Sequence, residues 1–119
     1  GKLIALHSLD DYLKYKESTL VLVTAKVKYF SDLHGYQANK INVKSQKTCW
    51  GSCSKKGNLN FNYKLQFLPE TVQDYIVVHE LCHLRELNHS KRFWGLVEKI
   101  IPNYPEVRSE LKSSGVRFY

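Results

Sequence analysis

Residues 77 to 89 read VVHELCHLRELNH and hold three of the five histidines in the chain. His79 and His83 are four residues apart, so on a helix their imidazoles share one face, one turn apart, and can bind one metal ion. Glu80 lies about 100° round the helix from His79. It would flank the ion, where a general base for metal-activated water belongs. The alternative is a structural pair of buried, hydrogen-bonded histidines. The adjoining glutamate favours a metal-dependent hydrolase.

A catalytic zinc ion takes three protein ligands and keeps one position open. Glu86 lies on the same helical face as His79 but about 10 Å further along the axis, too far for both to reach one ion. His89 is the better third ligand. Asn88 tolerates a left-handed turn and can end the helix, so that His89 swings back toward the metal. We therefore predict that His79, His83 and His89 bind Zn²⁺.

This histidine spacing is also that of the metzincin proteases. The metzincin pattern has glycine where this chain has Glu86, and it requires a methionine turn. The chain contains no methionine, so the metzincin family is disfavoured.

Length and composition indicate one globular domain over residues 1–119, with 43% hydrophobic and 24% charged residues. No apolar run approaches the ~18 residues of a membrane span, and no secretory signal is visible. The chain begins with Gly1, which suggests a processed or excised N-terminus. An odd cysteine count (Cys49, Cys53, Cys82) argues against a disulfide framework and favours the reducing cytoplasm. Cys82, in an apolar stretch, should pack as a small hydrophobe.

The formal net charge is +7, with 18 Lys and Arg against 11 Asp and Glu. Such a charge fits either a solvated surface or attraction for an anionic partner such as a nucleic acid, a nucleotide or an acidic protein. Arg85, Lys91 and Arg92 are close in sequence to the histidines and are candidates to meet an anionic substrate.

Local patterns predict an α+β protein. Ser8 caps a short helix over about 9–17, and a second helix runs from about 18 to 34, where Gly35 supplies a C-terminal cap. Residues 40–65 alternate apolar and polar residues around Lys56-Gly57-Asn58, which predicts a hairpin. Pro69 opens a central, buried helix that runs to about Leu87. Two helices follow, one from Ser90 to Pro102 and one over about 104–114, ending at Gly115.

Two longer stretches carry a family resemblance. WGSCSKKGNLNFN (50–62) and LPETVQDYIVVHELCHLRELNHSKRFWGLVEKIIPNY (68–104) closely resemble the YgjP-like metallopeptidase domain family. The resemblance implies a zincin-like fold, with N-terminal helices, a small sheet, the central histidine helix and two C-terminal helices. It also implies a zinc site of His79, His83 and His89, with Glu80 catalytic. The family usually has arginine where this chain has Cys49, and Lys47 is a candidate replacement. Family members are commonly longer, with an additional N-terminal β-rich half.

Other residues have both a functional and a structural interpretation. In the functional interpretation, Trp50, Ser52 and Cys53 line the cleft beside the metal. In the structural one, the hairpin packs Trp50 on the central helix. For Asn60 and Asn62, the functional interpretation is that they orient the zinc ligands. The structural interpretation is that they pair with the adjacent backbone. Phe93 and Trp94 are expected in the core. Tyr104 could polarise a substrate carbonyl, but a surface tyrosine before Pro105 is the favoured interpretation. His7 and His34 are expected to be ordinary surface histidines.

The function favoured by the sequence is zinc-dependent hydrolysis, with peptides or proteins as substrates and Glu80 as the base. A second candidate is a metal-dependent nucleotide or phosphoanhydride hydrolase, although the chain lacks a Gly-rich phosphate loop. A third is a non-catalytic, zinc-containing module that binds nucleic acid. Glu80 discriminates against this third candidate, because a structural zinc site has no use for a carboxylate beside the metal.

Overall fold

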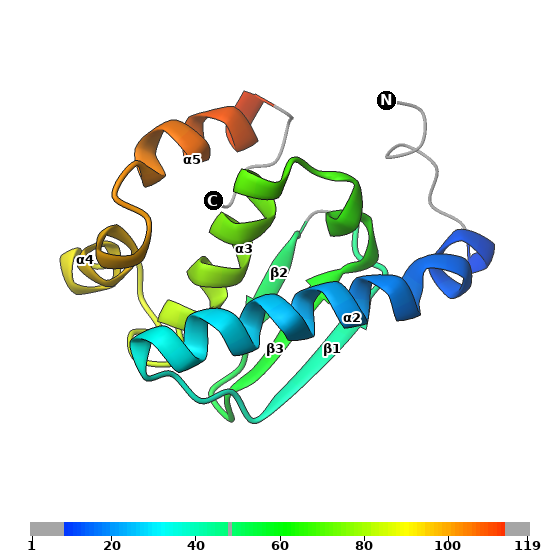
Figure 1. Ribbon diagram of the computed structural model, residues 1–119, viewed down its shortest axis with the longest axis horizontal. Coiled ribbons are helices and arrows are strands. Elements are labelled where there is room, and N and C mark those ends of the chain that lie inside the picture. Colours follow the sequence, from blue (N-terminus) through cyan, green and yellow to red (C-terminus); the bar gives the residue numbers. More distant parts are fainter. Residues whose placement is uncertain (1–8, 48, 114–119) are drawn as a thin grey trace.

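The computed structural model describes residues 9–47 and 49–113. In chain order the elements are α2 (Leu9–His34), β1 (Lys40–Lys44), β2 (Gly51–Cys53), β3 (Asn58–Asn62), the 3₁₀ helix η1 (Tyr63–Phe67), α3 (Glu70–Cys82), α4 (Lys91–Ile100) and α5 (Tyr104–Ser113) (Figure 1). The α+β class is thus confirmed. No helix in the described ranges is both long enough and apolar enough to cross a membrane.

The N-terminal region forms one helix, so the prediction of two helices over 9–17 and 18–34 is wrong. Ser18 does not begin a new helix, because its hydroxyl donates to the Tyr15 carbonyl at 3.0 Å. Thr19 is buried and donates to the Tyr63 carbonyl at 2.7 Å, which fixes the middle of α2 against η1. Gly35 ends α2 at φ +75°, the left-handed conformation expected of a glycine C-cap. Ser8 lies outside the described residues.

The sheet has the order β1-β3-β2. The prediction of one hairpin over residues 40–65 is wrong in its pairing. β2 and β3 form the antiparallel hairpin, with Gly57 at φ +83° in the turn, whereas β1 lies parallel to β3. A parallel pairing depends on contacts distant in sequence, which alternation within one strand cannot reveal. Leu65 belongs to η1 and not to a strand.

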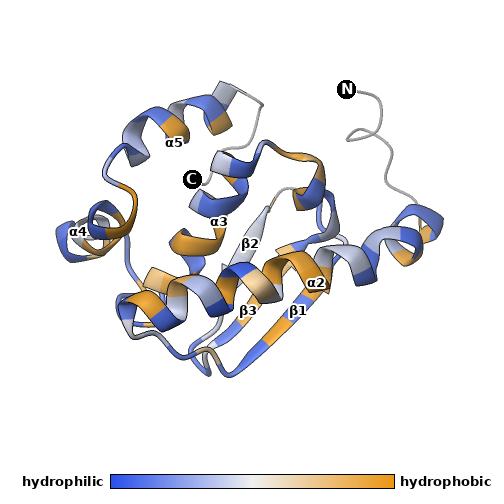
Figure 2. Ribbon diagram, viewed as in Figure 1, coloured by the Kyte–Doolittle hydropathy of each residue, from blue (hydrophilic) through white to orange (hydrophobic). Residues whose placement is uncertain are grey.

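α3 is the central helix, as predicted, and contacts α2, α4, α5 and β2. Ten of its thirteen residues are buried. It ends at Cys82, five residues before the predicted end at Leu87. Figure 2 shows apolar residues in the middle of α2 and alternating with hydrophilic ones along β1. Cys82 is fully buried, as expected.

The two C-terminal helices pack against α3 through one face each. Ser90 caps α4 by accepting from the Phe93 amide at 3.4 Å, and α4 ends before Pro102, as predicted. Phe93 and Val97 are the buried residues of α4, and Val107 and Leu111 are those of α5. Gly115 lies outside the described residues.

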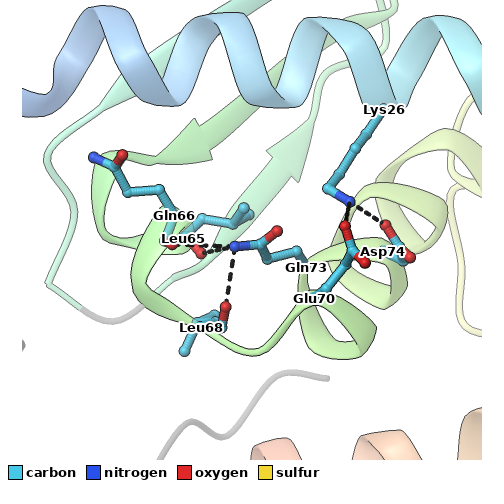
Figure 3. Close-up of polar contacts among 7 residues, drawn as sticks. All are labelled: Lys26, Leu65, Gln66, Leu68, Glu70, Gln73 and Asp74. Carbon is cyan, nitrogen blue, oxygen red and sulfur yellow. Dashed lines mark hydrogen bonds and ion pairs between the residues drawn. The ribbon is translucent and has the colours of Figure 1, made fainter.

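Gln73 connects the beginning of α3 to η1 and the loop after it (Figure 3). Its Nε2 atom lies 3.2, 3.1 and 3.0 Å from the carbonyl oxygens of Leu65, Gln66 and Leu68. Lys26 of α2 reaches the same helix from outside, at 2.6 Å from Asp74 and 3.4 Å from Glu70. Gln73 therefore satisfies backbone carbonyls in a buried position, whereas Glu70 is 81% exposed.

We predict that Gln73→Ala lowers the free energy of unfolding by about 1–3 kcal/mol, because the carbonyls of Gln66 and Leu68 lose their side-chain donor, although the Leu65 carbonyl still accepts from the Leu68 amide. Glu70→Ala should cost less than about 0.5 kcal/mol, as expected for one exposed ion-pair partner. Urea unfolding of the two variants beside the parent chain measures both. Equal losses in the two variants would contradict the role given to Gln73.

Candidate metal centre

Three histidine side chains converge at the C-terminal end of α3. The Nε2 atoms of His79 and His83 are 3.2 Å apart, those of His83 and His89 3.1 Å, and those of His89 and His79 3.2 Å. The three nitrogens therefore form a nearly equilateral triangle. The structure thus brings together all three histidines that the sequence singled out, and among the described residues this is the group able to hold a metal ion.

The triangle has the dimensions of a metal site. An ion bound tetrahedrally to nitrogens at about 2.0–2.1 Å holds those nitrogens about 3.3–3.4 Å apart. Hydrogen bonding alone does not explain the arrangement. A bond between two Nε2 atoms needs one protonated and one bare nitrogen. Around a triangle at least one pair must be alike, and that pair repels. A cation at the centre attracts all three lone pairs at once, so the residues fit a metal ion.

The three imidazoles are held in the neutral form that binds metals. Burial is the main cause of the low pKa of His79, about 2, and the charges of His83, His89 and Arg108 lower it further. Burial also lowers the pKa values of His83 and His89. The His83 Nδ1 atom lies 3.0 Å from the Glu86 carbonyl oxygen. Donation by Nδ1–H to that oxygen leaves the Nε2 lone pair for the metal.

The segment after α3 returns His89 to the end of the helix, but not by the predicted route. Asn88 is not left-handed, since no described non-glycine residue has positive φ. The helix instead ends early, and the amides of Arg85 and Glu86 both donate to the Cys82 carbonyl at 3.1 Å. With α3 ending at Cys82, the chain has room to turn back before His89. Glu86 contributes its backbone carbonyl to His83 and is not part of the group that can hold a metal.

Aromatic rings fix the orientation of the imidazoles. Phe93 stacks on His83 with ring centroids 4.4 Å apart and meets His79 and His89 edge to face. Trp94 stacks on His89 at 5.9 Å. Two adjacent residues of α4 therefore hold all three imidazoles. Phe93 is buried and Trp94 partly buried, both packed in the core as expected.

Glu80 is only 2% exposed and lies in the same cleft as the histidines. This cleft has a volume of about 270 Å³, and its residues are Cys49, Gly51, Ser52, Cys53, His79, Glu80, His83, Leu87 and His89. A Cβ atom at Gly51 would lie 3.1 Å from Glu80 Cγ and 3.0 Å from the Asn60 carbonyl oxygen. Glycine at position 51 thus lets β2 approach the carboxylate. The local signal for this contact is a glycine inside a strand.

Arg108 is a positively charged residue near the three histidines, a position that the sequence did not predict. Its guanidinium carbon lies 4.7 Å from the centroid of the Trp94 ring, and its charge lowers the pKa values of His79 and His89. Tyr104 also stacks on Trp94, with centroids 5.2 Å apart, so the prediction of a simple surface tyrosine is wrong. Arg108 comes from α5, about 20 residues after His89, and no local pattern connects the two.

The other candidates divide between the cleft and the scaffold. Cys49, Ser52 and Cys53 line the cleft, and burial raises the pKa of Cys53 to about 11, with a further contribution from Glu80. Trp50 is buried in the core cluster. Asn62 donates to the Gln46 and Cys49 carbonyls, and Asn60 bonds to Asn42 and Ser52. The Asn62 contacts match the structural interpretation, whereas Asn60 bonds to side chains and not to the backbone. His34 is exposed, as expected, and His7 lies outside the described residues.

Fold and centre together are those of a metallopeptidase. The metallopeptidase zymogen abylysin of Pyrococcus abyssi is 28% identical, with a TM-score of 0.69 over 77% of this chain and 93% of that one. The metallopeptidase zymogen jannalysin of Methanocaldococcus jannaschii is 22% identical and shares the fold, with a TM-score of 0.67 over 79% of this chain and 97% of that one. Among curated proteins, no sequence matches this chain.

The family model for the YgjP-like metallopeptidase domain matches residues 9–114. The chain belongs to the YgjP-like metallopeptidase family and is a metal-dependent peptidase.

The low pKa of His79 predicts a pH-dependent stability of the metal-free protein. Unfolded histidine takes up a proton near pH 6.5, whereas folded His79 resists protonation down to about pH 2. Stability is therefore full above about pH 6.5 and falls as the pH drops below that value. His79 alone should account for about 2 kcal/mol between about pH 7.5 and pH 5. Urea unfolding of chelator-treated protein across this range measures the loss.

His79→Gln is the control for this experiment, because glutamine does not titrate there. Its pH profile should be flatter than that of the parent chain by the contribution of one histidine. A parent profile without a slope below pH 6.5 would contradict the buried, neutral state of His79.

Proposed function

We propose that this peptidase is a zinc enzyme in which His79, His83 and His89 bind the ion and Glu80 is the general base. The observation that carries the proposal is the convergence of three Nε2 atoms, 3.1–3.2 Å apart, in the cleft that also contains Glu80. Three neutral imidazoles without a thiolate or carboxylate ligand are a donor set typical of catalytic zinc.

Zinc bound there would polarise the substrate carbonyl and acidify the attacking water. Glu80 would accept the proton from that water and return it to the leaving amine. Burial of Glu80 against Gly51 restricts its side chain to the cleft. The contact of His83 Nδ1 with the Glu86 carbonyl fixes the tautomer of one ligand, and Phe93 and Trp94 fix the ring planes.

The substrate we propose is an extended peptide segment laid along β2. Within the described residues, β2 has a single strand neighbour, β3, and all three of its residues line the cleft. An extended peptide can add to the outer edge of such a strand through backbone hydrogen bonds. In this position a peptide carbonyl would lie in the cleft that β2 shares with the three histidines. The small volume of the cleft, about 270 Å³, suits a few residues of an extended chain.

The first prediction from this mechanism concerns the ligands. We expect one zinc ion per chain by mass spectrometry of the purified protein. His79→Ala, His83→Ala and His89→Ala should each weaken zinc binding by at least about tenfold, since each removes a directly coordinating nitrogen. Glu86→Ala is the matched control, because its backbone carbonyl remains. Full zinc affinity in His89→Ala, with loss in Glu86→Ala, would refute the assignment of the third ligand.

The second prediction concerns Glu80. Glu80→Gln keeps the size of the side chain but cannot accept the proton. Turnover of a fluorogenic peptide library should fall by about 10² or more, the scale of a lost general base. Zinc content and the unfolding midpoint should stay close to those of the parent chain. Parental turnover in Glu80→Gln would exclude Glu80 as the base, and loss of zinc or of folding would make it a structural residue.

A further inference from the structure

A second hollow lies against the segment that carries the third histidine. It has a volume of about 440 Å³ and is formed by Arg85, Glu86, Arg92, Gly95, Leu96 and Lys99. We call it the basic groove. A smaller hollow of about 140 Å³, bordered by His34 and Tyr36, shares Arg85, Leu96 and Lys99 with it. The two hollows therefore form one continuous surface along α4 to the C-terminal end of α2.

The charges of the basic groove are unbalanced. The groove is lined by three cationic side chains, those of Arg85, Arg92 and Lys99, and by one carboxylate, that of Glu86. None of the three ion pairs found in the described ranges involves these residues. Lys26 and Lys28, in contrast, are paired with carboxylates on α3 and α2. The groove thus presents positive charge that the folded chain itself does not neutralise.

Arg85 is held in place before any partner arrives. Its guanidinium carbon lies 3.8 Å from the centroid of the Tyr36 ring. Its Nη2 atom donates to the carbonyls of His34 and Gly35 at 3.1 and 2.7 Å, at the end of α2. A cation fixed in this way loses little conformational entropy on binding, which favours association.

Gly95 gives the basic groove its depth. It lies in the middle of α4, where glycine costs up to about 1 kcal/mol relative to alanine. Packing does not require it, because a Cβ atom at Gly95 would have no atom within 4 Å. The glycine opens a depression beside the half-buried side chain of Leu96, where an apolar side chain of a partner can lie.

The spacing of the cations fits an extended chain. Arg92 and Lys99 are seven residues apart on α4, about 10 Å along the helix axis. Residues three apart in an extended peptide are separated by about the same distance. Two carboxylates with an apolar residue between them would therefore meet Arg92, the depression at Gly95 and Lys99 in turn. The groove contains no open aromatic face for a nucleotide base, since Arg85 covers Tyr36.

We propose that the basic groove is an exosite that binds an extended acidic segment of the protein substrate. The segment from His83 to Ser90 separates the two sites, with Leu87 and His89 in the metal cleft and Arg85 and Glu86 in the groove. A substrate held in the groove is thus kept next to the metal centre. The assignment of the docked segment to a substrate rests on the proposed peptidase mechanism, whereas the docking itself does not.

The test uses fluorescence anisotropy with a labelled octapeptide that contains Glu-Leu-Ser-Glu. The protein is the full chain with Glu80→Gln, so that the probe is not cleaved. We expect saturable binding of the probe, with an affinity at least tenfold lower in the Arg92→Glu/Lys99→Glu variant. The affinity should also decrease as the salt concentration rises from about 50 to 200 mM. A probe with glutamine in place of glutamate should not bind. Binding of the glutamine probe, or no binding of the acidic probe, would overturn the proposal.

Lys14→Glu/Lys44→Glu is the matched control, because it changes the net charge by the same amount. The Tyr12 hydroxyl donates to the Val43 carbonyl, so both lysines lie near the N-terminal part of α2. The groove lies at the other end of this 26-residue helix, which is about 39 Å long. Equal weakening in both double variants would show general charge attraction and overturn the exosite.

Gly95→Leu tests the shape of the groove without changing its charge. It should reduce binding of the probe by at least tenfold while the thermal midpoint stays level or rises. Unchanged affinity would overturn the role of the depression. If a short RNA binds more tightly than the peptide and loses affinity in the Arg92→Glu/Lys99→Glu variant, the occupant is nucleic acid and the peptide assignment fails. Peptide binding without any peptidase activity would leave docking of an acidic segment in the groove standing, and would remove both the proposed mechanism and the assignment of that segment to a substrate.

Discussion

The free-energy cost of removing two imidazoles and a carboxylate from water at the end of α3 constrains the rest of the molecule. His79, Glu80 and His83 are all buried, on a helix whose other buried residues make up much of the core. Burying imidazoles and a carboxylate is costly unless each finds a partner. The histidines meet this cost by remaining neutral and by directing three Nε2 atoms at one point. The surrounding elements supply what this arrangement needs, namely a wall of aromatic rings from α4, a strand that approaches closely at Gly51 and a cation from α5.

The elements around this cluster are held more by hydrogen bonds from side chains to backbone carbonyls than by ion pairs. Gln73 serves three carbonyls at the start of α3, Thr19 fixes α2 against η1, and Asn62 bonds to two carbonyls before β2. These buried bonds determine where α3 and β2 lie relative to each other. The exposed ion pair of Lys28 with Asp32 contributes much less to stability, because water and salt screen it. The geometry of the metal centre therefore depends on uncharged side chains outside it, of which Thr19 and Asn62 come from other elements and Gln73 from the start of α3.

The sequence predicted the features that depend on local spacing. His79 and His83 at helical spacing, the glycine cap of α2 and the serine cap of α4 are each decided within about one turn of chain. The features it missed depend on distant contacts. The parallel pairing of β1 with β3 and the place of Arg108 arise from tertiary packing. His89 was singled out by its residue type and does lie beside His79 and His83, yet the predicted route of the chain back to them was wrong, because α3 ends at Cys82 and Asn88 is not left-handed.

The early end of α3 also explains how one short segment can serve two surfaces. If the helix continued to Leu87, residues 85 and 86 would belong to its next turn. His89 would then lie too far along the helix axis to approach His79. Because the helix stops at Cys82, His83 can pair with the Glu86 carbonyl while Arg85 reaches the end of α2. The same turn that completes the metal centre therefore fixes a cation of the basic groove. Arg85 is two residues from His83, so the basic groove and the metal centre share one short turn of backbone.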